Sequence, residues 1–273
     1  MLPNPLFEIF GQGVHMYGIC IALGLVLCLT VFYVYTKRKG MPEDVQDFVF
    51  FVAIFAIAIG FLVAKFYQAV YDWIETKKFD FMGAGITVMG GLIGGAAAFL
   101  LVYFVGGLFV FKGRKKGLHV KHFNTVFLTA PICITVAHGF GRLGCLMAGC
   151  CHGAYLGKEY VFGGIWMKAS SGWGYYVPTQ LYEAVFLFIL TAVLTVLYFK
   201  RCNIIMAIYL IAYGVWRIII EFFRTDARGA IVLGLAPSQW QSFIFIAGGI
   251  ALILFYVFRK IPLKLPEEKD KEE

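Results

Sequence analysis

The sequence has few charged residues for its length. Charged side chains make up 15% of the 273 residues, whereas a water-soluble domain carries about 25%. Apolar residues account for 60% of the chain, and its mean hydropathy is +0.79. Such a chain cannot cover a folded surface with polar groups, which excludes a soluble enzyme, an exported soluble domain and a disordered chain. The composition predicts an all-α, polytopic membrane protein.

The sequence also lacks a disulfide framework and a nucleic-acid-binding face. Four of the seven cysteines stand singly in apolar runs, where cysteine behaves as a small hydrophobic residue. The net charge is +8, but most Lys and Arg residues lie in short stretches between apolar runs. That distribution is typical of membrane topology signals, so we expect no nucleic acid among the partners.

Long apolar runs predict a bundle of about seven transmembrane helices. The runs cover residues 16–36, 48–64, 81–111, 123–147, 180–199, 203–223 and 239–258. The third run is too long for one span, so we interpret its glycine-rich beginning as a re-entrant or interfacial segment. With the N-terminus outside, the inside loops hold 15 Lys and Arg residues and the outside segments hold 6, which predicts an N-out, C-in orientation.

The predicted domain organisation is simple. Residues 1–262 form a single transmembrane bundle, and its largest loop, at about 151–177, forms a small cap on the outside. Residues 263–273 are rich in charge, and this composition predicts a disordered cytoplasmic tail.

One predicted span carries an unusual set of ionisable residues. Arg217, Glu221 and Arg224 follow Tyr213 at helical spacing and therefore share one face. A buried arginine costs about 2.5–3.5 kcal/mol on insertion scales, so such residues need a reason. A surplus of positive charge on this face indicates a site for a lipid phosphate. The structural alternative is an ion pair that fixes helix packing.

A second face of this kind lies in the run 138–145. His138, Arg142 and Cys145 are spaced for one side of a helix, and glycines, Gly144 among them, let a backbone or a ligand approach closely. Arginine binds phosphate through its planar fork. The alternative is a glycine-rich packing seam with one arginine that reaches the interface.

Other motifs are better explained by structure than by chemistry. Glu183 follows Pro178 at a helix start, where a carboxylate complements the helix dipole. The overlapping GxxxG patterns in the run 90–95 indicate helix–helix contact. Tyr17, at the outer end of the first span, is typical of an aromatic belt.

Three cysteines form a cluster next to a histidine: Cys145, Cys150 and Cys151, followed by His152. Thiolates and imidazole are ligands for a soft metal ion. The cluster could instead carry a covalent intermediate or a redox-active thiol, or it could pack at a helix end. We assign no metal and no cofactor from the sequence alone.

Five segments in this order resemble the prolipoprotein diacylglyceryl transferase family over nearly the whole chain. They are His-x-Tyr-Gly at 15–18, Gly-Gly-Leu-Ile-Gly at 90–94, Gly-Arg-Leu-Gly at 141–144, Pro-Thr-Gln-Leu-Tyr-Glu at 178–183, and Tyr-Gly-x-x-Arg-x-x-x-Glu-Phe-Phe-Arg at 213–224. The resemblance implies an enzyme that moves the diacylglyceryl group of phosphatidylglycerol to the thiol of a lipobox cysteine in a prolipoprotein, with release of glycerol phosphate.

The resemblance also implies functional positions. The residues that match them are Tyr17, Arg142, Gly153, Arg217 and Glu221. The chain departs from the family pattern at four positions, where it has Met89 for His, Cys145 for Asn, Cys150 for Glu and Phe61 for Arg. These departures indicate a divergent, cysteine-rich branch, with either a prolipoprotein or another thiol acceptor.

The reaction requires neutralisation of the phosphate and removal of the thiol proton. We expect Arg142, Arg217 and Arg224 to bind the phospholipid. Glu221 would hold Arg217, and Tyr17, Gly144 and Gly153 complete the predicted site. For the base we expect His138 first and His152 second, because Met89 cannot take a proton.

Two other functions stay open. A membrane thiol, redox or covalent-intermediate lipid enzyme would use Cys145, Cys150 and Cys151, and a non-catalytic protein would only bind phospholipid. For each of these functions, the predicted location is the bacterial cytoplasmic (inner) membrane, with several crossings and contact with membrane lipids.

Overall fold

The computed structural model describes residues 5–9, 12–85, 87–169, 172–224 and 235–265. The chain divides into two compact units, and each is described by itself. The first contains residues 1–32 and 127–273, and the second contains residues 33–126.

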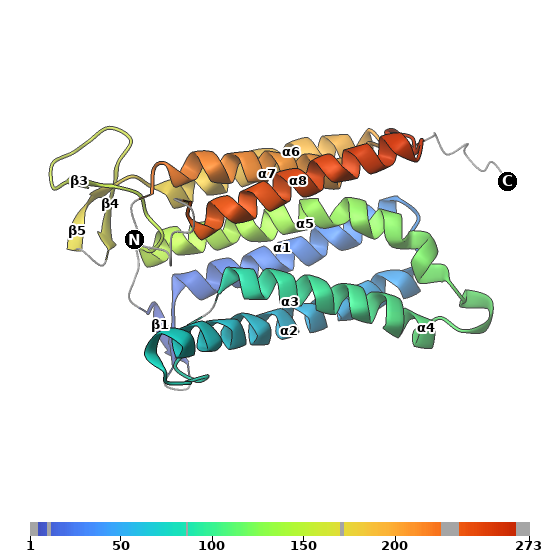
Figure 1. Ribbon diagram of the computed structural model, residues 1–273, viewed down its shortest axis with the longest axis horizontal. Helices are drawn as coiled ribbons and strands as arrows, with labels where there is room; N and C mark the ends of the chain where they lie inside the picture. The colour runs from blue at the N-terminus through green and yellow to red at the C-terminus, as the bar shows by residue number, and fades with distance from the viewer. Residues whose placement is uncertain (1–4, 10–11, 86, 170–171, 225–234, 266–273) are drawn as a thin grey trace. The chain divides into compact units, whose positions relative to one another are not determined.

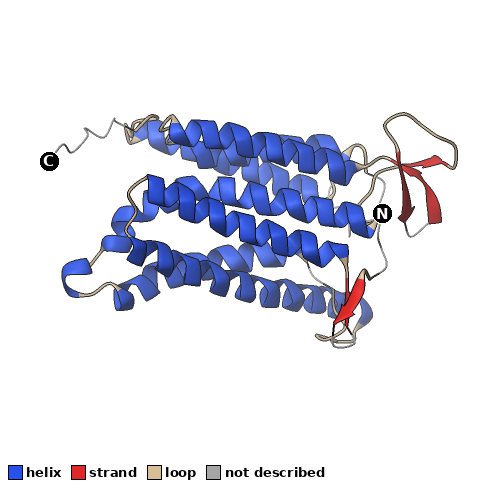
Figure 2. Ribbon diagram, turned by 180° about the vertical axis from the view of Figure 1, so that it is seen from behind, coloured by secondary structure: helices blue, strands red, loops and turns tan. Residues whose placement is uncertain are grey.

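Helices dominate the described chain (Figures 1 and 2). The α-helices are α1 (Met16–Arg38), α2 (Glu43–Thr76), α3 (Val88–Leu101), α4 (Gly107–Val110), α5 (Leu118–Ala148), α6 (Thr179–Phe199), α7 (Ile205–Glu221) and α8 (Pro237–Phe258). A π-helical turn, η1 (Val102–Gly106), joins α3 to α4, and a 3₁₀ turn, η2 (Gly113–Lys115), precedes α5.

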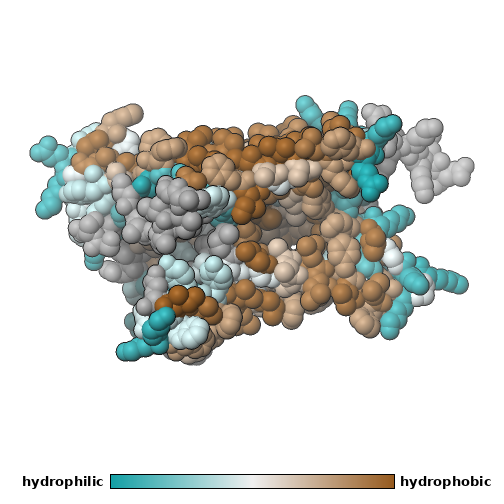
Figure 3. Space-filling model, viewed as in Figure 1, coloured by the Kyte–Doolittle hydropathy of each residue, from teal (hydrophilic) through white to brown (hydrophobic). Residues whose placement is uncertain are grey.

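The predicted all-α membrane bundle is confirmed. Among the described residues, six helical segments are long and apolar enough to cross a membrane, namely Met16–Arg38, Glu43–Ile74, Gly90–Val110, Gly113–Ala148, Thr179–Phe199 and Ser238–Phe258. The remaining predicted span, residues 203–223, corresponds to α7 (Ile205–Glu221), which has 17 residues. Large apolar side chains, such as Leu101 and Ile244, are exposed along the helices, and hydrophilic side chains gather at the helix ends (Figure 3). The N-out orientation stays a prediction.

The first unit contains helices α5 to α8 and the N-terminal part of α1. Helix α7 packs against α6 and α8. Thr191 of α6 donates a 2.9 Å hydrogen bond to Thr135 of α5. Helix α1 approaches α5 where Gly24 lies beside Ala137 and Phe140. These contacts place the middle of α5 beside α1 and α6, which matters for the site below.

The loop between α5 and α6 contains a small antiparallel sheet. Its strands are β3 (Tyr155–Gly157), β4 (Ile165–Ala169) and β5 (Gly172–Tyr176), in the order β3-β5-β4. Met167 and Tyr176 of this sheet are buried against Leu146 of α5. The sheet falls within the predicted cap region 151–177, and the side of the membrane on which it lies stays a prediction. A separate hairpin pairs β1 (Phe7–Ile9) with β2 (Gln12–Val14).

The C-terminal end of the described chain turns back onto the loop between α6 and α7. The backbone N–H of Asn203 donates to the Leu263 carbonyl at 2.8 Å, and that of Leu265 donates to the Arg201 carbonyl at 2.8 Å. Two of the first three residues of the predicted disordered tail, 263–273, are therefore hydrogen-bonded, namely Leu263 and Leu265. Residues 266–273 lie outside the described chain.

The second unit is built on close packing between α2 and α3. The backbones meet where a Cβ added at Gly60 would lie 3.0 Å from the carbonyl oxygen of Gly91. The expectation of helix–helix contact for the glycine run is therefore confirmed. The interpretation of the glycine-rich beginning of residues 81–111 as a re-entrant or interfacial segment is wrong for residues 90–95, because they belong to α3 itself.

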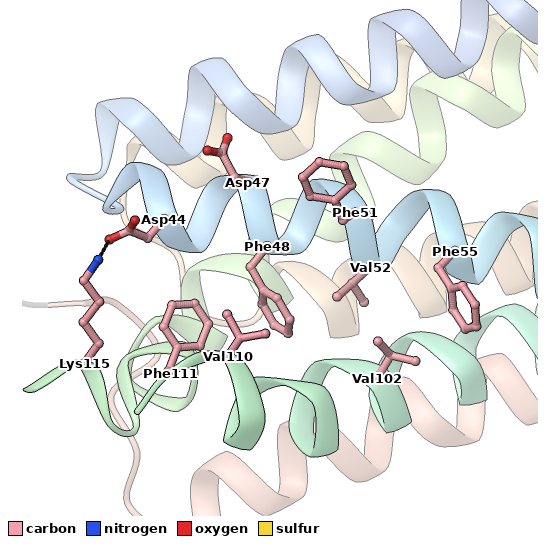
Figure 4. A pocket seen from close by; sticks show the side chains of 10 residues that line it. All are labelled: Asp44, Asp47, Phe48, Phe51, Val52, Phe55, Val102, Val110, Phe111 and Lys115. Atoms are coloured by element: carbon pink, nitrogen blue, oxygen red, sulfur yellow. Dashed lines mark hydrogen bonds and ion pairs between the residues drawn. The ribbon is translucent and has the colours of Figure 1, made fainter. Parts of the chain in front are cut away.

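A cavity of about 720 Å³ opens between α2 and the η1–α4 segment of the second unit (Figure 4). Its walls are mostly apolar, with Phe48, Phe51 and Phe55 from α2, and at one end the Lys115 ammonium pairs with the Asp44 carboxylate. None of the predicted site residues lines this cavity.

Candidate functional site

The centre of the candidate site is the buried carboxylate of Glu183 on α6. Its Oε2 lies 3.0 Å from Nε of Arg142 and 4.0 Å from Nη1 of Arg217. Its Oε1 accepts a 3.0 Å hydrogen bond from the Tyr213 hydroxyl and lies 3.8 Å from Nε2 of His138. The Glu183 side chain is 0% exposed. Two guanidinium groups from separate helices therefore meet at one carboxylate.

Helical periodicity explains how each helix supplies two members of this cluster. His138 and Arg142 are one turn apart on α5, and Tyr213 and Arg217 are one turn apart on α7. The next residue on the α7 face is Glu221, whose Oε2 lies 3.4 Å from Nη2 of Arg217. The predicted pair between Arg217 and Glu221 is therefore present.

Glu183 changes the charge balance that the sequence suggested. Arg142 and Arg217 together carry two positive charges, and Glu183 and Glu221 carry two negative charges. A buried ion is tolerated when it is paired and hydrogen-bonded. The expectation that Glu183 only complements the dipole of α6 is incomplete, because its carboxylate contacts two other helices.

The three clustered cysteines lie where α5 ends. Their Sγ atoms all lie within 4.8 Å of one another. Helix α5 stops because Gly149 has a left-handed backbone with φ of 70°, and Cys151 is also left-handed at φ 62°. Glycine suits such a backbone, whereas cysteine adopts it at a cost. The loop that follows α5 therefore places the thiols of Cys150 and Cys151 close to that of Cys145.

The first turn of α6 holds this loop in place. The Thr179 hydroxyl donates a 2.8 Å hydrogen bond to the Cys151 carbonyl, and the buried Gln180 amide donates to the Cys150 carbonyl. Hydrogen bonds from the Cys145 and Cys150 thiols, with the nearby Arg224 guanidinium, lower the pKa of the Cys151 thiol.

Gly153 and Arg224 join the end of α7 to the same loop. Their backbones pair in an isolated antiparallel bridge. A Cβ added at Gly153 would lie 2.3 Å from the Phe223 carbonyl oxygen, so glycine is required by this close approach. His152 directly precedes Gly153 in the chain. Its ring packs on the Tyr176 ring, with the two centroids 4.5 Å apart.

Tyr17 and Gly144 meet where α1 passes α5. A Cβ added at Gly144 would lie 3.1 Å from the Tyr17 ring. Tyr17 is close enough to Arg142 and to the three cysteines to interact with them electrostatically. The predicted residues of the first unit therefore fall into two adjoining groups, one around Glu183 and one around the thiols.

Two departures from the family pattern lie in the second unit. Met89 lies in the first turn of α3, and Phe61 is exposed on α2. The candidate-site residue that the sequence analysis did not assign is Glu183, although the sequence contains a signal for it. An acidic residue on a membrane-spanning helix usually has a partner, and Glu183 was explained within its own helix instead.

The fold and the site define a class. The chain is a multi-pass membrane protein with a buried ionised cluster shared by three helices, and such clusters mark substrate sites in membrane proteins. The family model for prolipoprotein diacylglyceryl transferase matches residues 4–255. The chain therefore belongs to the prolipoprotein diacylglyceryl transferase family.

Curated relatives agree in name and in length. A phosphatidylglycerol–prolipoprotein diacylglyceryl transferase of Clostridium tetani is 32% identical, over 93% of this chain and 98% of the relative. The second such transferase of Clostridium perfringens is 31% identical, over 90% of this chain and 93% of the relative. The transferase of Streptococcus pneumoniae, strain Taiwan19F-14, is 28% identical, over 99% and 100% respectively.

Proposed function

We propose that this protein transfers the diacylglyceryl group of phosphatidylglycerol to a cysteine thiol of a prolipoprotein. Family membership and relatives named for this reaction support the activity. The observation that carries the proposal for this chain is the meeting of Arg142 and Arg217 at Glu183 inside the bundle. Two cations in a low-dielectric site suit a phosphodiester whose charge grows as the bond to it breaks.

Each arginine keeps donors for the phosphate. A guanidinium has five N–H donors, and Arg142 contacts Glu183 through Nε. Glu183 and Glu221 orient the two arginines, so they are positioning residues. Arg224, Tyr17, Gly144 and Gly153 belong to the same proposed phospholipid site.

The transfer forms a bond between the acceptor sulfur and the glyceryl CH₂ carbon. The bond from that carbon to the phosphate oxygen breaks, and its electron pair leaves with glycerol phosphate. The acceptor must first lose its proton, because the thiolate is the nucleophile. His138 is the proposed base, since its ring nitrogen lies near the Glu183 carboxylate, which would stabilise an imidazolium. His152 is the second choice.

The proposed location follows from the substrates. Phosphatidylglycerol and prolipoproteins meet in the bacterial cytoplasmic (inner) membrane, and the apolar helices make this chain a multi-pass membrane protein. The proposed partners are phosphatidylglycerol, a lipobox-containing prolipoprotein or another thiol acceptor, and the surrounding lipids.

The test uses the purified full-length chain with labelled phosphatidylglycerol and a lipobox peptide. We expect lipidated peptide from the wild type. R142Q and R217Q should each lose at least about 100-fold in rate, the size of effect seen when one charge-stabilising donor is removed. R259Q, at the end of α8, is the matched control and should retain activity.

Absence of product from the wild type would contradict the proposal, and so would wild-type rates for both arginine variants. Bound phospholipid without product would instead indicate a non-catalytic lipid-binding protein.

A thiol-dependent membrane enzyme is the second candidate function, because the structure brings three thiols together at the end of α5. It predicts that C150S and C151S remove activity while R142Q and R217Q do not. The same set of variants therefore separates the two functions.

A further inference from the structure

The thiol cluster of Cys145, Cys150 and Cys151 adjoins the proposed phosphate site and has a geometry of its own. The three Sγ atoms lie within 4.8 Å of one another. Thiolates bound to a tetrahedral zinc ion at about 2.3 Å are about 3.8 Å apart, so small side-chain rotations bring these three to a common ion. Three thiolates are a ligand set for a soft or borderline divalent ion.

The backbone holds the cluster in this arrangement. Cys151 keeps a left-handed φ of 62°, and its carbonyl is bound by the Thr179 hydroxyl at 2.8 Å. The Cys150 backbone N–H donates to the Cys145 carbonyl at 3.2 Å, which fixes the loop on the last turn of α5. A strained residue that persists in one conformation at a cluster of reactive groups points to function.

The charges around the cluster suit a thiolate-bound ion. Three thiolates and one divalent ion carry a net charge of −1. Arg224 lies close enough to Cys151, and Arg142 to Cys145 and Cys151, to interact with them electrostatically. These guanidinium groups balance the excess negative charge, which lowers the cost of placing it at the edge of the bundle.

The cluster offers three ligands, and catalytic zinc sites differ from structural ones in keeping a fourth position open. In the part of the chain that the structure describes, no histidine, aspartate or glutamate joins the three thiols. We infer that Cys145, Cys150 and Cys151 bind one zinc-like divalent ion whose open fourth position takes the acceptor thiol as a thiolate. This inference rests on the proposed function for the identity of the acceptor, and it adds a metal that the sequence did not assign.

Such an ion would activate the acceptor thiol, and it would thereby replace family residues that this chain lacks. A thiol that coordinates a divalent ion is deprotonated, and here its proton passes through water to the proposed base, His138. The bound sulfur then attacks the glyceryl CH₂ carbon, the bond from that carbon to the phosphate oxygen breaks, and the electron pair leaves with glycerol phosphate. The ion stays on the three cysteines throughout.

The other uses of these thiols are less favourable. A covalent intermediate on Cys150 or Cys151 would be a thioether, and its carbon–sulfur bond is the same kind of bond as in the product. Transfer through this thioether would therefore require a carbon–sulfur bond to be broken, which is as difficult as the direct displacement. A disulfide would need an oxidant, and it would leave one of the three thiols unused.

The first experiment measures ion binding without activity. The full-length chain in detergent is stripped with a chelator under reducing conditions and titrated with Co²⁺, whose sulfur-to-metal absorption reports thiolate ligands. We expect one ion per chain, displaced by Zn²⁺. C145S, C150S and C151S should each weaken binding at least about tenfold, since even residues behind the ligands change metal affinity by about 10–100-fold. C202S is the matched control and should bind as the wild type does.

The second experiment tests the open position. A lipobox peptide with its cysteine should increase the sulfur-to-cobalt absorption of the loaded wild type, and the same peptide with serine should not. Thermal unfolding of each variant shows that it is folded. Less than one ion per wild-type chain, or binding that persists in the triple serine variant, would overturn the ion site.

Activity separates this inference from the proposed function. Transfer that continues after complete removal of metal overturns the role of the ion and leaves the proposed function standing. A chain that binds the ion but transfers nothing to any peptide contradicts the proposed function, and the acceptor step with it, while the ion site stands.

Discussion

The two units of this protein differ in where their charged residues lie and in what forms their tightest interior contact. In the first unit, four residues converge on a Glu183 side chain that is 0% exposed. In the second unit, the ion pair between Lys115 and Asp44 is solvent-exposed, with side chains 57% and 54% exposed. The tight interior feature of the second unit is instead the glycine contact between α2 and α3.

The difference separates residues kept for chemistry from residues kept for packing. A buried charged group loses its hydration, and several partners must compensate for that cost. Removing the charged group therefore affects both stability and function. An exposed pair gains little from its partner. Glycines at a helix contact act by their small size, so their effect depends on which of them faces the neighbouring backbone.

The largest effect is expected for E183Q. The variant leaves two arginines without their shared carboxylate, and breaking a buried ion pair costs about 3–5 kcal/mol. We expect the free energy of unfolding in mixed micelles to fall by that amount and transfer activity to be lost. The matched control is E159Q on the exposed loop, which should stay within about 0.5 kcal/mol of the wild type. Equal unfolding free energies for the two variants would show that Glu183 is not the centre of a buried cluster.

A smaller effect is expected for Y213F, which removes one hydrogen bond to the Glu183 carboxylate. Hydrogen bonds to charged groups contribute about 1.5–3 kcal/mol, so the unfolding free energy should fall within that range. Y209F removes a hydroxyl one turn earlier on α7, where no hydrogen bond is present among the described residues, and serves as control. If Y209F were as destabilising as Y213F, the loss would come from removing a buried hydroxyl in general and not from the bond to Glu183.

The glycine contact of the second unit gives a comparison within one motif. A Cβ at Gly90 would lie 3.0 Å from the Ala64 Cα, whereas a Cβ at Gly91 would lie 3.4 Å from the Ala64 Cβ, an ordinary contact. G90A should therefore lower the unfolding free energy by about 1–3 kcal/mol through overpacking. G91A should be neutral or stabilising, because alanine is the better helix former by about 1 kcal/mol. Thermal unfolding of both variants checks the prediction. Equal midpoints for G90A and G91A would contradict it.

The sequence predicts the apolar runs that form the long helices and the residues that share a helix face. The pairing of Arg217 with Glu221 follows from spacing within α7, and the structure confirms it. The role of Glu183 could not be read in this way, because its partners come from α5 and α7, and spacing within one helix says nothing about neighbouring helices.

The same limit applies to the glycine run and to the cysteines. The overlapping GxxxG patterns predict a helix contact, but only the packed backbone distinguishes Gly90 from Gly91. Cys145, Cys150 and Cys151 are close in sequence, yet their convergence depends on the left-handed residues at 149 and 151. A cysteine in that conformation is not predictable from its residue type.

The smallest effect is expected for K115Q, and it tests the other side of the comparison. The pair with Asp44 is exposed, so the variant should change the unfolding free energy by no more than about 1 kcal/mol. Salt distinguishes the two kinds of pair, because ions screen exposed charges far more than buried ones. The difference between K115Q and the wild type should therefore vanish in high salt, whereas that of E183Q should persist. A loss for K115Q as large as that for E183Q, and independent of salt, would mean that exposure does not decide what an ion pair contributes in this bundle.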